Sequence, residues 1–419
     1  MERRRVVIIG GGFGGVAAAQ ALRRAEVEIT LIDRTNHHLF QPLLYQVATA
    51  ALSPGDIAWP LRTIFRSQRN VRVMMDEVQR IDRSARLVHV AEQRAIPFDC
   101  LIIAPGSRHS YFNHPGWERF APGLKTLADA VDLRERMLLA FETAERLANR
   151  TGAGVPITFV IVGGGPTGVE LAGALAEIGR NAMLPDFPSL KREMVKILLV
   201  EAGDRILSAF APRLSAVAQA SLESMGVTVL LKTAVEDVGS AGVLVGGELI
   251  ATTNVIWAAG NRASPLLASL AVPLDAAGRV LVRPDLTIPD DPWVFVIGDA
   301  ASVPDAQGRP LPGLAPVAMQ QGRYAANLIA QCIPPQQRPA FRYADRGTLA
   351  TIGRAKAVAQ IGPLGLSGLW AWLLWCFVHI FFLIGFRNRF RVMSEWIWYY
   401  LTFKPGARLL YLTRDKPSS

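Results

Sequence analysis

The sequence of 419 residues predicts an α/β protein with two parallel-sheet domains and a C-terminal module of amphipathic helices. A glycine-rich turn joins a β-branched run to a helix-forming run at 10–15, and the same pattern returns at 163–168. Residues 364–386 contain no Asp, Glu, Lys or Arg. Strands that alternate with helices are typical of parallel sheets, and a long uncharged run indicates contact with a membrane.

The first strand and its turn open the chain. Val6–Ile9 is a short β-branched run of the kind that forms buried parallel strands, and 16–22 predicts a helix. Between them, Gly10, Gly12 and Gly15 match the pattern G-x-G-x-x-G. These glycines allow a tight turn and let backbone N–H groups approach a pyrophosphate at a helix N-terminus. The run at 6–9 is too short for a signal peptide, so we expect the body of the protein in the cytoplasm.

An acid follows the second strand of this unit. Val27–Ile32 predicts that strand, and Asp33 comes after it at close to the spacing of roughly 20 residues expected for a ribose-binding carboxylate. We therefore expect a dinucleotide at the turn. The alternatives are a glycine turn that serves packing alone and an acid that faces solvent.

A second copy of this plan begins near residue 157. Ile157–Val162 predicts a strand, 169–178 a helix, and Val195–Val200 a strand that ends before Glu201. An insertion around 181–193 lengthens the spacing between turn and acid. The glycines that match the pattern are Gly163, Gly165 and Gly168.

Glu201 also bears on the choice of nicotinamide cofactor. A carboxylate that accepts the ribose hydroxyls would repel a 2′-phosphate, which favours NADH over NADPH. Arg205 lies close behind it in the sequence and leaves some use of NADPH open.

Three further runs complete the predicted sheets. Strands are expected within 85–103, at Val255–Trp257 and at Val294–Ile297, and 317–331 predicts a helix. Gly298-Asp299 follows the last of these strands. Such a turn can return the chain to a nucleotide, and the alternative is that Asp299 caps a helix.

Composition excludes several other classes of protein. The chain has 45 Lys and Arg against 35 Asp and Glu, a net charge of +10, and only 3 cysteines. So few cysteines exclude a disulfide scaffold, and because no two of them stand at C-x-x-C spacing, a zinc ribbon and a thioredoxin-type site are excluded as well. The 6 histidines do not cluster with acids in the sequence, so we predict no metal site.

The C-terminal tail allows two interpretations. Residues 364–386 are long enough to span a bilayer, but glycines interrupt the run and Trp370, Trp372 and Trp375 favour an interface. A span would export the arginines that follow, against the positive-inside tendency, so we expect residues 364–419 to lie on an anionic lipid surface, with 392–403 as a second helix. Nucleic acid is not expected, because the basic residues alternate with many apolar ones. They are Arg387, Arg389, Arg391, Lys404, Arg408, Arg414 and Lys416.

The order of these parts resembles that of flavin-dependent pyridine nucleotide reductases. Four segments resemble type II NADH:quinone dehydrogenases more specifically, and the likeness extends over nearly the whole chain. They are Asn36–Ala48, Gly163–Leu171, Phe341–Tyr343 with Gly347–Gly353, and Gly385–Arg389. The resemblance implies a single-subunit respiratory enzyme that does not pump protons, with FAD in the first domain and NADH in the second. It also implies that Asp299 contacts FAD, that the protein is a homodimer, and that it attaches monotopically to the cytoplasmic face of the bacterial inner membrane.

The resemblance also implies a quinone site. The family motif reads A-Q-x-A-x-Q, and residues 315–320 of this chain read A-P-V-A-M-Q. Pro316 therefore lacks the amide of the first glutamine, whereas Gln320 is kept and Gln321 follows it. The acceptor is expected to be ubiquinone or menaquinone. Residues 34–99 contain no cysteine, which excludes the redox pair of the related disulfide reductases.

Glu170 is expected in the first turn of the helix of the second domain. In that place it could simply complement the helix dipole. The resemblance implies instead that it lies near the nicotinamide and the flavin, where it steers NADH or a proton. We therefore name Glu170, Gln320 and Gln321 as candidate catalytic residues.

The remaining candidate contacts belong to two cofactors and a quinone. For FAD they are Gly10, Gly12, Phe13, Gly14, Gly15, Asp33, Arg34, Gln41, Val78, Ala104, Gly106, Asp299 and Ala318. For NADH they are Gly163, Gly165, Pro166, Thr167, Gly168, Glu201, Ala259 and Gly260. For the quinone they are Pro316, Met319 and Gln320.

These assignments imply a division of the chain by ligand. Residues 1–115 and 281–340 would form a Rossmann-like FAD-binding domain, 116–280 an inserted Rossmann-like NADH-binding domain, and 341–419 the membrane anchor. The expected activity is the oxidation of NADH through FAD, coupled to the two-electron reduction of a membrane quinone. Two alternatives remain, a reductase of a soluble redox protein and a non-enzymatic flavoprotein that senses NADH.

Overall fold

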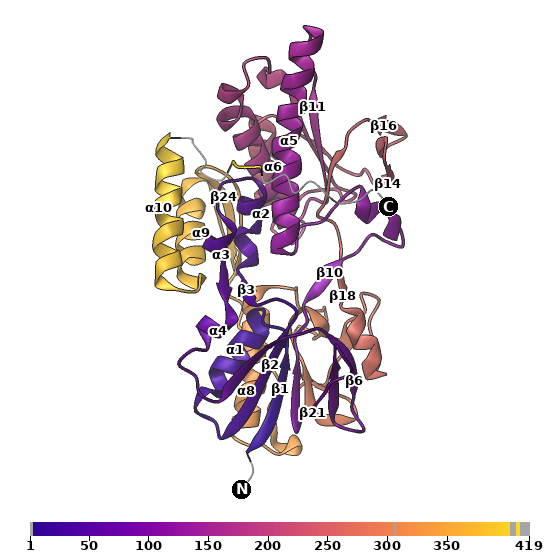
Figure 1. Cartoon of the computed structure of the whole chain (residues 1–419), viewed down its shortest axis with the longest axis vertical. Coiled ribbons are helices and arrows are strands. Elements are labelled where there is room, and N and C mark those ends of the chain that lie inside the picture. The colour runs from indigo at the N-terminus through magenta and orange to yellow at the C-terminus, as the bar shows by residue number, and fades with distance from the viewer. Residues whose placement is uncertain (1–2, 306, 403–407, 411–419) are drawn as a thin grey trace. The chain divides into compact units, whose positions relative to one another are not determined.

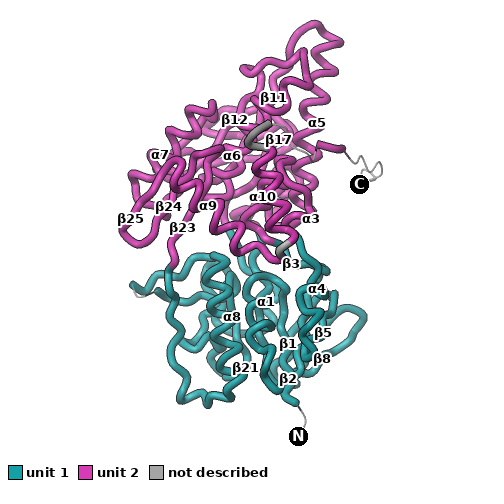
Figure 2. The backbone as a smooth tube through the Cα atoms, turned by 90° about the vertical axis from the view of Figure 1, so that its left-hand side faces the viewer, with its two compact units in different colours: residues 1–39, 58–108, 261–345 teal, residues 40–57, 109–260, 346–419 magenta. Residues whose placement is uncertain are grey.

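The computed structural model describes residues 3–305, 307–402 and 408–410 (Figure 1). Two compact units make up the structure, and each is assembled from three separate stretches of chain (Figure 2). Unit 1 comprises 1–39, 58–108 and 261–345, and unit 2 comprises 40–57, 109–260 and 346–419. The FAD-binding, NADH-binding and membrane-anchoring domains predicted from the sequence have boundaries that differ from those of these two units. That division of the chain stays a prediction.

A six-stranded sheet forms the core of unit 1. Its order is β20-β21-β9-β1-β2-β5, and all neighbours run parallel except β20 and β21. The strands are β1 (Arg4–Ile9), β2 (Val27–Asp33), β5 (Val71–Met75), β9 (Cys100–Ile103), β20 (Thr287–Ile288) and β21 (Asp291–Val296). The strands predicted at 6–9, 27–32 and 294–297 are confirmed, because their aliphatic side chains are buried on both faces of the sheet.

Helices α1 (Phe13–Ala21) and α8 (Ala315–Ala330) pack side by side against one face of this sheet (Figures 1 and 2). They approach closely because neither has a side chain at the contact: a Cβ on Gly322 would lie 2.3 Å from the carbonyl oxygen of Gly14. Both helices are confirmed, and both begin a few residues earlier than predicted. The last glycines of the turn already form the first turn of α1.

The other elements of unit 1 connect these layers. β6 (Val78–Asp82), β7 (Leu87–Val90) and β8 (Ala95–Pro97) form an antiparallel sheet. Strands β7, β8 and β9 confirm the strands predicted within 85–103. The remaining strands and helices are β3 (His37–Leu39), β4 (Ala58–Pro60), α4 (Leu61–Ile64), β19 (Val280–Leu281) and β22 (Ala301–Ser302). At the points where the chain leaves and re-enters unit 1 lie β10 (Ser107–His109) and β18 (Asn261–Ala263).

Unit 2 is built around a four-stranded parallel sheet. Its order is β13-β12-β11-β17, and the strands predicted at 157–162, 195–200 and 255–257 are confirmed. The strands are β11 (Ile157–Val162), β12 (Val195–Val200), β13 (Val227–Leu230) and β17 (Asn254–Trp257). The other elements of this part are α2 (Leu44–Ala48), α3 (Pro54–Ile57), α5 (Leu127–Thr151), α7 (Pro212–Ser224) and the antiparallel strands β14 (Val235–Gly239), β15 (Gly242–Val245) and β16 (Glu248–Ile250).

Helix α6 (Pro166–Glu177) follows the second glycine turn and begins before the predicted residue 169. Proline is well suited to the first turn of a helix, because its fixed φ is helical and its missing N–H would have no helical partner there. Glu170 therefore lies beyond the first turn, which contains no acidic residue, and its predicted place in that turn is wrong.

The C-terminal part of unit 2 is a three-stranded sheet followed by two helices. The strands are β23 (Thr348–Gly353), β24 (Lys356–Ile361) and β25 (Leu364–Ser367), and the helices are α9 (Leu369–Phe382) and α10 (Phe386–Thr402). The uncharged run is thus divided between β25 and α9, and the second helix begins earlier than the predicted residue 392. No helix within the described ranges is long and apolar enough to cross a membrane. Phe403, Lys404, Arg414 and Lys416, which the sequence assigned to the membrane surface, lie outside the described residues.

Strand β23 crosses helix α6 at very short range. A Cβ added to Gly173 would lie 1.6 Å from the carbonyl oxygen of Ile352, so the backbone of β23 occupies the place of a side chain. The same approach brings the N–H of Thr351 to within 3.4 Å of Glu170 Oε1. The position of β23 against α6 therefore determines the surroundings of Glu170, a candidate catalytic residue.

Substitution of Gly173 tests this approach. Gly173→Ala should lower the free energy of unfolding by more than about 2 kcal/mol, because the clash with backbone exceeds the gain in helix propensity. Chemical denaturation of the intact protein measures the effect. Gly116→Ala is the control, since its Cβ would meet nothing within 4 Å. Equal stability of the two variants would contradict the close crossing.

Candidate active site

Each unit contains one glycine turn, and the first glycine of both turns has the same conformation. Gly10 has φ +101° and Gly163 has φ +108°. A Cβ on Gly10 would lie 2.1 Å from the carbonyl oxygen of Ala104, and one on Gly163 would lie 2.8 Å from the carbonyl carbon of Ala258. In both units the turn therefore packs against the residue that follows the neighbouring parallel strand, β9 or β17.

The last glycine of each turn is equally restricted. A Cβ on Gly15 would lie 1.8 Å from the carbonyl oxygen of Gly10, and one on Gly168 would lie 1.9 Å from that of Gly163. Only a residue without a side chain fits between strand and helix at these two positions. The matching distances show that the internal repeat found in the sequence is also a repeat of geometry.

The middle glycine of each turn lies at an open helix N-terminus. Gly12 and Gly165 are the N-cap residues of α1 and α6, and neither helix has a side-chain cap. A Cβ on either glycine would meet nothing within 4 Å, and Pro166 and Thr167 beside the second are exposed. Uncapped N–H groups that face open space, at the positive end of a helix, form a cradle that fits the pyrophosphate of FAD or NADH.

A carboxylate holds each turn from the side. Asp33 Oδ2 accepts a hydrogen bond from Gly11 N–H at 2.6 Å, and Glu201 Oε2 accepts one from Gly164 N–H at 2.6 Å. The second oxygen of Asp33 accepts from Thr35, and that of Glu201 accepts from Gly203 N–H at 2.7 Å. Because a carboxylate can accept about four hydrogen bonds, both acids can also take ribose hydroxyls.

His38 also holds the first turn, and sequence analysis missed it. Its Nδ1 donates to the carbonyl oxygen of Gly11 at 3.0 Å, and its ring stands edge-on to Phe13 with centroids 5.0 Å apart. Burial lowers the pKa of His38, so the ring is neutral, and its Nε2 is buried without a hydrogen-bond partner. A buried acceptor next to the cradle is consistent with a bound ligand there. The only sequence signal was the position of His38 within the segment 36–48.

The Gly-Asp turn is fixed by two side chains of unit 1. Asp299 Oδ2 accepts a hydrogen bond from Ser107 Oγ at 2.6 Å. Gly298, at φ +68°, donates its N–H to Gln321 Oε1 at 2.6 Å. Gln321 is buried, so its amide supports the turn, and a direct catalytic role for it remains only a prediction. Asp299 is not a helix cap, because Ile297 precedes the short 3₁₀ turn as its N-cap and Leu314 caps α8.

The candidate quinone residues lie at the N-terminal end of α8. Pro316 is in the first turn of the helix, where the loss of an N–H costs no helical hydrogen bond. Gln320 exchanges two hydrogen bonds with the backbone of Ala344, at 2.9 and 3.0 Å. Met319 is half-buried beside it. A quinone carbonyl could accept the hydrogen bond that the Gln320 amide now donates to the carbonyl oxygen of Ala344.

The environment of Glu170 in unit 2 favours a protonated carboxyl. Burial raises the pKa of Glu170 to about 8, and the N–H of Thr351 and the indole of Trp375 act in the opposite direction. This residue can therefore hold a proton at neutral pH and release it slightly above.

The other predicted contacts lie at several places within the two units. In unit 1, Arg34 is exposed after β2, Val78 is half-buried at the start of β6, and Gly106, at φ +71°, follows β9 with open space around it. Ala318 lies on α8, with its Cβ near Gly298. In unit 2, Gln41 donates to the carbonyl oxygen of Lys125 at 3.1 Å, and Ala259 and the exposed Gly260 follow β17.

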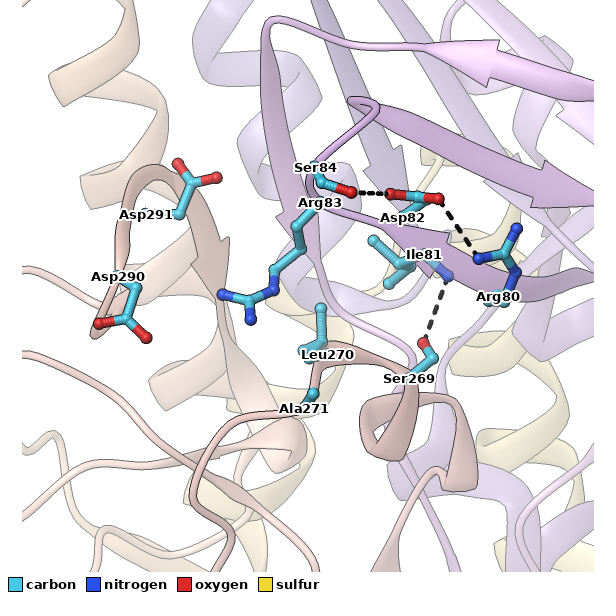
Figure 3. Close-up of a pocket in the computed structure, with 10 residues that line it drawn as sticks. All are labelled: Arg80, Ile81, Asp82, Arg83, Ser84, Ser269, Leu270, Ala271, Asp290 and Asp291. Carbon is cyan, nitrogen blue, oxygen red and sulfur yellow. Dashed lines mark hydrogen bonds and ion pairs between the residues drawn. The ribbon is translucent and has the colours of Figure 1, made fainter.

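Two further observations concern sites of other kinds. Within the described part of the chain, no three or more His, Cys, Asp or Glu side chains are grouped as metal ligands would be. A shallow groove of about 540 Å³ lies in unit 1 between the β6–β7 turn and Leu270 (Figure 3). Arg83 points into it, whereas Arg80 bonds Asp82. None of the predicted site residues line this groove.

The chain matches two protein-family models. The first is described as "Pyridine nucleotide-disulphide oxidoreductase" and matches residues 4–322. The second is described as "NDH2 C-terminal domain" and matches residues 346–403.

Named relatives and solved structures agree with these matches. The chain is 44% identical to the type II NADH:quinone oxidoreductase NdhA of Mycobacterium tuberculosis, over 94% of this chain and 86% of the relative. It is 42% identical to Ndh of the same organism, over 97% and 90% of the two chains. The structure of NDH2 from Plasmodium falciparum in complex with NADH is similar with a TM-score of 0.86 and 18% identity, and the match covers 96% of this chain and 99% of that one. That last likeness concerns the fold.

A pair of glycine substitutions distinguishes ligand binding from packing. Gly165→Ala should leave the free energy of unfolding within about 1 kcal/mol of the original, because its Cβ meets no protein atom, but should weaken NADH binding at least about 10-fold by entering the cradle. Gly168→Ala is the matched variant and should destabilise the fold instead. Titration with NADH and denaturation of both variants measure this. Unchanged NADH affinity in a folded Gly165→Ala protein would contradict the assignment.

Proposed function

The chain belongs to the type II NADH:quinone oxidoreductase family, and we propose that it oxidises NADH through FAD and delivers two electrons to a membrane quinone without pumping protons. The observation that carries this proposal is the repeated nucleotide-binding turn, one in each unit, in a chain whose helices α9 and α10 have exposed aromatic residues. The chain thus contains two candidate nucleotide-binding sites and a candidate membrane-binding surface, at which it could meet a lipid-soluble acceptor.

The first turn is assigned to FAD and the second to NADH. When bound, FAD supplies a flavin ring that takes a hydride from NADH and passes two electrons to a second substrate. Asp33, His38 and the Gly298-Asp299 turn would hold the FAD in unit 1. Glu201 would bind the adenosine ribose of NADH and disfavour a 2′-phosphate, because Arg205 turns to the carbonyl oxygen of Ser208.

The quinone is assigned to the first turns of α8. This helix begins beside the Gly-Asp turn and the first glycine turn of the same unit, so a ring bound by Pro316, Met319 and Gln320 would be close to the FAD site. Pro316 offers an apolar surface without an amide, which leaves Gln320 as the side chain that can donate to a quinone carbonyl.

A lipid surface is the proposed partner of the C-terminal helices. Trp370 is 74% exposed, Phe377 68% and Phe381 57%, and they follow one another along one face of α9. On α10, Phe390, Ile397 and Trp398 are exposed as well. Aromatic side chains on helices too short to span a bilayer are suited to the headgroup region. We place this surface on the cytoplasmic face of the bacterial inner membrane, where NADH is available, and the protein there as a homodimer.

Charge contributes less to this surface than the sequence indicated. Arg391 pairs with the buried Asp56 at 3.3 Å, Arg389 donates to the carbonyl oxygen of Leu383 at 2.8 Å, and Arg408 pairs with Asp186. Arg387 is exposed. The apolar face of α9 is therefore the main support for membrane contact.

Flavin absorbance tests the overall proposal. The purified protein is mixed with NADH without oxygen, and a quinone is then added. Rapid bleaching by NADH followed by rapid recovery with quinone is expected. Bleaching without recovery would favour a soluble protein acceptor or an NADH sensor.

Removal of the Glu170 carboxyl gives a second test of the proposed function. We expect quinone reduction at saturating substrate to fall as pH rises through about 8, because Glu170 then loses the proton that it supplies. Glu170→Gln should remove this pH dependence and lower turnover by about 10- to 100-fold, while bleaching of the flavin by NADH stays unchanged.

Glu177 on the same helix provides the control for that test. Burial also raises its pKa, but its carboxyl accepts the N–H of Arg354. Glu177→Gln should keep the pH dependence near 8. A pH profile that survives in Glu170→Gln would show that another group carries the proton.

The exposed face of α9 can be tested by a triple substitution. Trp370→Ser with Phe377→Ser and Phe381→Ser should release the protein from lipid vesicles, because most of the apolar area that enters the interface is lost. Activity with a long-chain quinone in vesicles should fall at least about 10-fold, and activity with a water-soluble quinone should stay within about 2-fold.

The control removes exposed apolar side chains elsewhere. Met75, Leu249 and Leu281 are exposed and lie outside α9 and α10. Their replacement by serine should leave vesicle binding intact. Equal losses with both quinones in the α9 variant would argue against a membrane role.

A further inference from the structure

A loop of unit 2, residues 202–211, connects the end of β12 to helix α7. It begins directly after Glu201, and Gly203 N–H donates to Glu201 Oε1 at 2.7 Å. Further along, Leu207 N–H donates to the carbonyl oxygen of Gly164 at 2.8 Å. The loop therefore starts at the carboxylate proposed to bind the adenosine ribose and returns to the second glycine turn. We expect it to border the adenosine half of NADH.

The middle of this loop has a conformation that depends on its contacts. Leu207 has φ +48°, in the left-handed region that bulky side chains rarely adopt. Its side chain and that of Ile206 are buried, and a Cβ on Gly164 would lie 2.8 Å from the Ile206 side chain. A backbone of this kind persists only where the surrounding structure holds it. The anchors at the two ends of the loop therefore determine its shape.

The far end of the loop is anchored by a side chain of the C-terminal sheet. Ala211 is the N-cap residue of α7, and its N–H donates to Gln360 Oε1 of β24 at 2.8 Å. In a capping box, a Glu or Gln three residues into the helix accepts this N–H, but Leu214 occupies that position here. Gln360, which lies 149 residues farther along the chain, accepts it instead.

Packing between the same elements supports this hydrogen bond. Helix α7 lies beside β24 and β25 (Figure 2), and a Cβ on Gly365 of β25 would be in ordinary contact with the Leu214 side chain, at 3.4 Å. Helix α9, which we propose to contact lipid, packs on β24 as well. The sheet that supports α9 thus also supports the N-terminus of α7 and the loop before it.

We propose that Gln360 is a positioning residue for NADH, which holds loop 202–211 against the second glycine turn in the shape that receives the adenosine half of the cofactor. The proposal rests on the proposed binding of NADH at that turn. Gln360 acts through the N–H of Ala211 and the loop, so its loss should weaken the binding of NADH without slowing the hydride transfer that follows.

Substitutions of Gln360 in the full-length, FAD-loaded protein test the proposal. Gln360→Met is similar in size but removes the acceptor, so the NADH concentration that bleaches the flavin at half the maximal rate should rise about 3- to 10-fold. Gln360→Glu keeps an oxygen at the same reach and should restore the original value. Gln219→Ala removes a glutamine that donates to Glu223 on α7, and this control should change nothing. An unchanged value in a folded Gln360→Met protein would overturn the proposal.

Fragments of the cofactor show which half of it the loop holds. ADP-ribose contains the adenosine half, and calorimetry should show the same loss of affinity for it in Gln360→Met. Reduced nicotinamide mononucleotide lacks that half, so its half-maximal concentration, like the maximal rate of bleaching by NADH, should stay within about 2-fold. Equal losses for both fragments would show that Gln360 serves only the general stability of the unit and would overturn the positioning role.

The variant of the glycine turn separates this proposal from the proposed function. Gly165→Ala enters the cradle itself, so an unchanged affinity for NADH in that variant would overturn the binding of NADH at the second turn. A weakened affinity in Gly165→Ala beside an unchanged one in Gln360→Met would overturn the positioning role alone.

A shorter side chain and a measurement without ligand keep the test available if Gln360→Met does not fold. Gln360→Asn keeps the amide but is one methylene too short to accept the N–H of Ala211. Hydrogen exchange of the Ala211 amide should be faster in this variant than in the original protein and should remain slow in Gln360→Glu. Equal exchange in all three proteins would overturn the proposal.

Discussion

In both units of this protein, a carboxylate accepts a hydrogen bond from the backbone N–H of the glycine turn that precedes it. This hydrogen bond organises each unit. Asp33 in unit 1 and Glu201 in unit 2 make this contact at the same distance. The bond aligns the turn with the end of the next strand, and the glycines let strand, turn and helix come together without side chains. The helix N-termini therefore stay uncapped and open. Glu170 lies on α6, one of these two helices, and the quinone candidates lie on α8, which packs against the other, α1.

Much of the fold could be predicted from the sequence because its signals are local. Short β-branched runs such as Ile157–Val162 favour buried strands, and the glycine patterns beside them have a specific steric reason. Helix starts are less predictable, since the sequence pattern places Pro166 and Gly14 in the preceding turns, whereas both belong to their helices. The uncharged tail was divided between a strand and a helix by a pattern that hydropathy alone does not show.

The roles of several site residues depend on contacts distant in sequence, which no local pattern encodes. Gln321 looked equivalent to Gln320, but the buried amide of one supports Gly298 and the half-exposed amide of the other bonds Ala344. His38 and Ser107 gave no signal of their own because their partners, Gly11 and Asp299, lie in other segments. Burial raises the pKa of Glu170, and the two groups that oppose this rise, Thr351 and Trp375, lie far along the chain.

The interleaving of the two units constrains how the chain can fold during its synthesis. Neither unit is contiguous: β9 of unit 1 must wait for β21, which leaves the ribosome only after all of 109–260. Unit 2 needs β23, which follows all of unit 1 in the sequence, before α6 is covered. At translation rates of about 5–20 residues per second, apolar edges of both sheets stay exposed for several seconds or longer. Native assembly is thus largely post-translational, and chaperones that shield strand edges are expected to raise the yield of the enzyme.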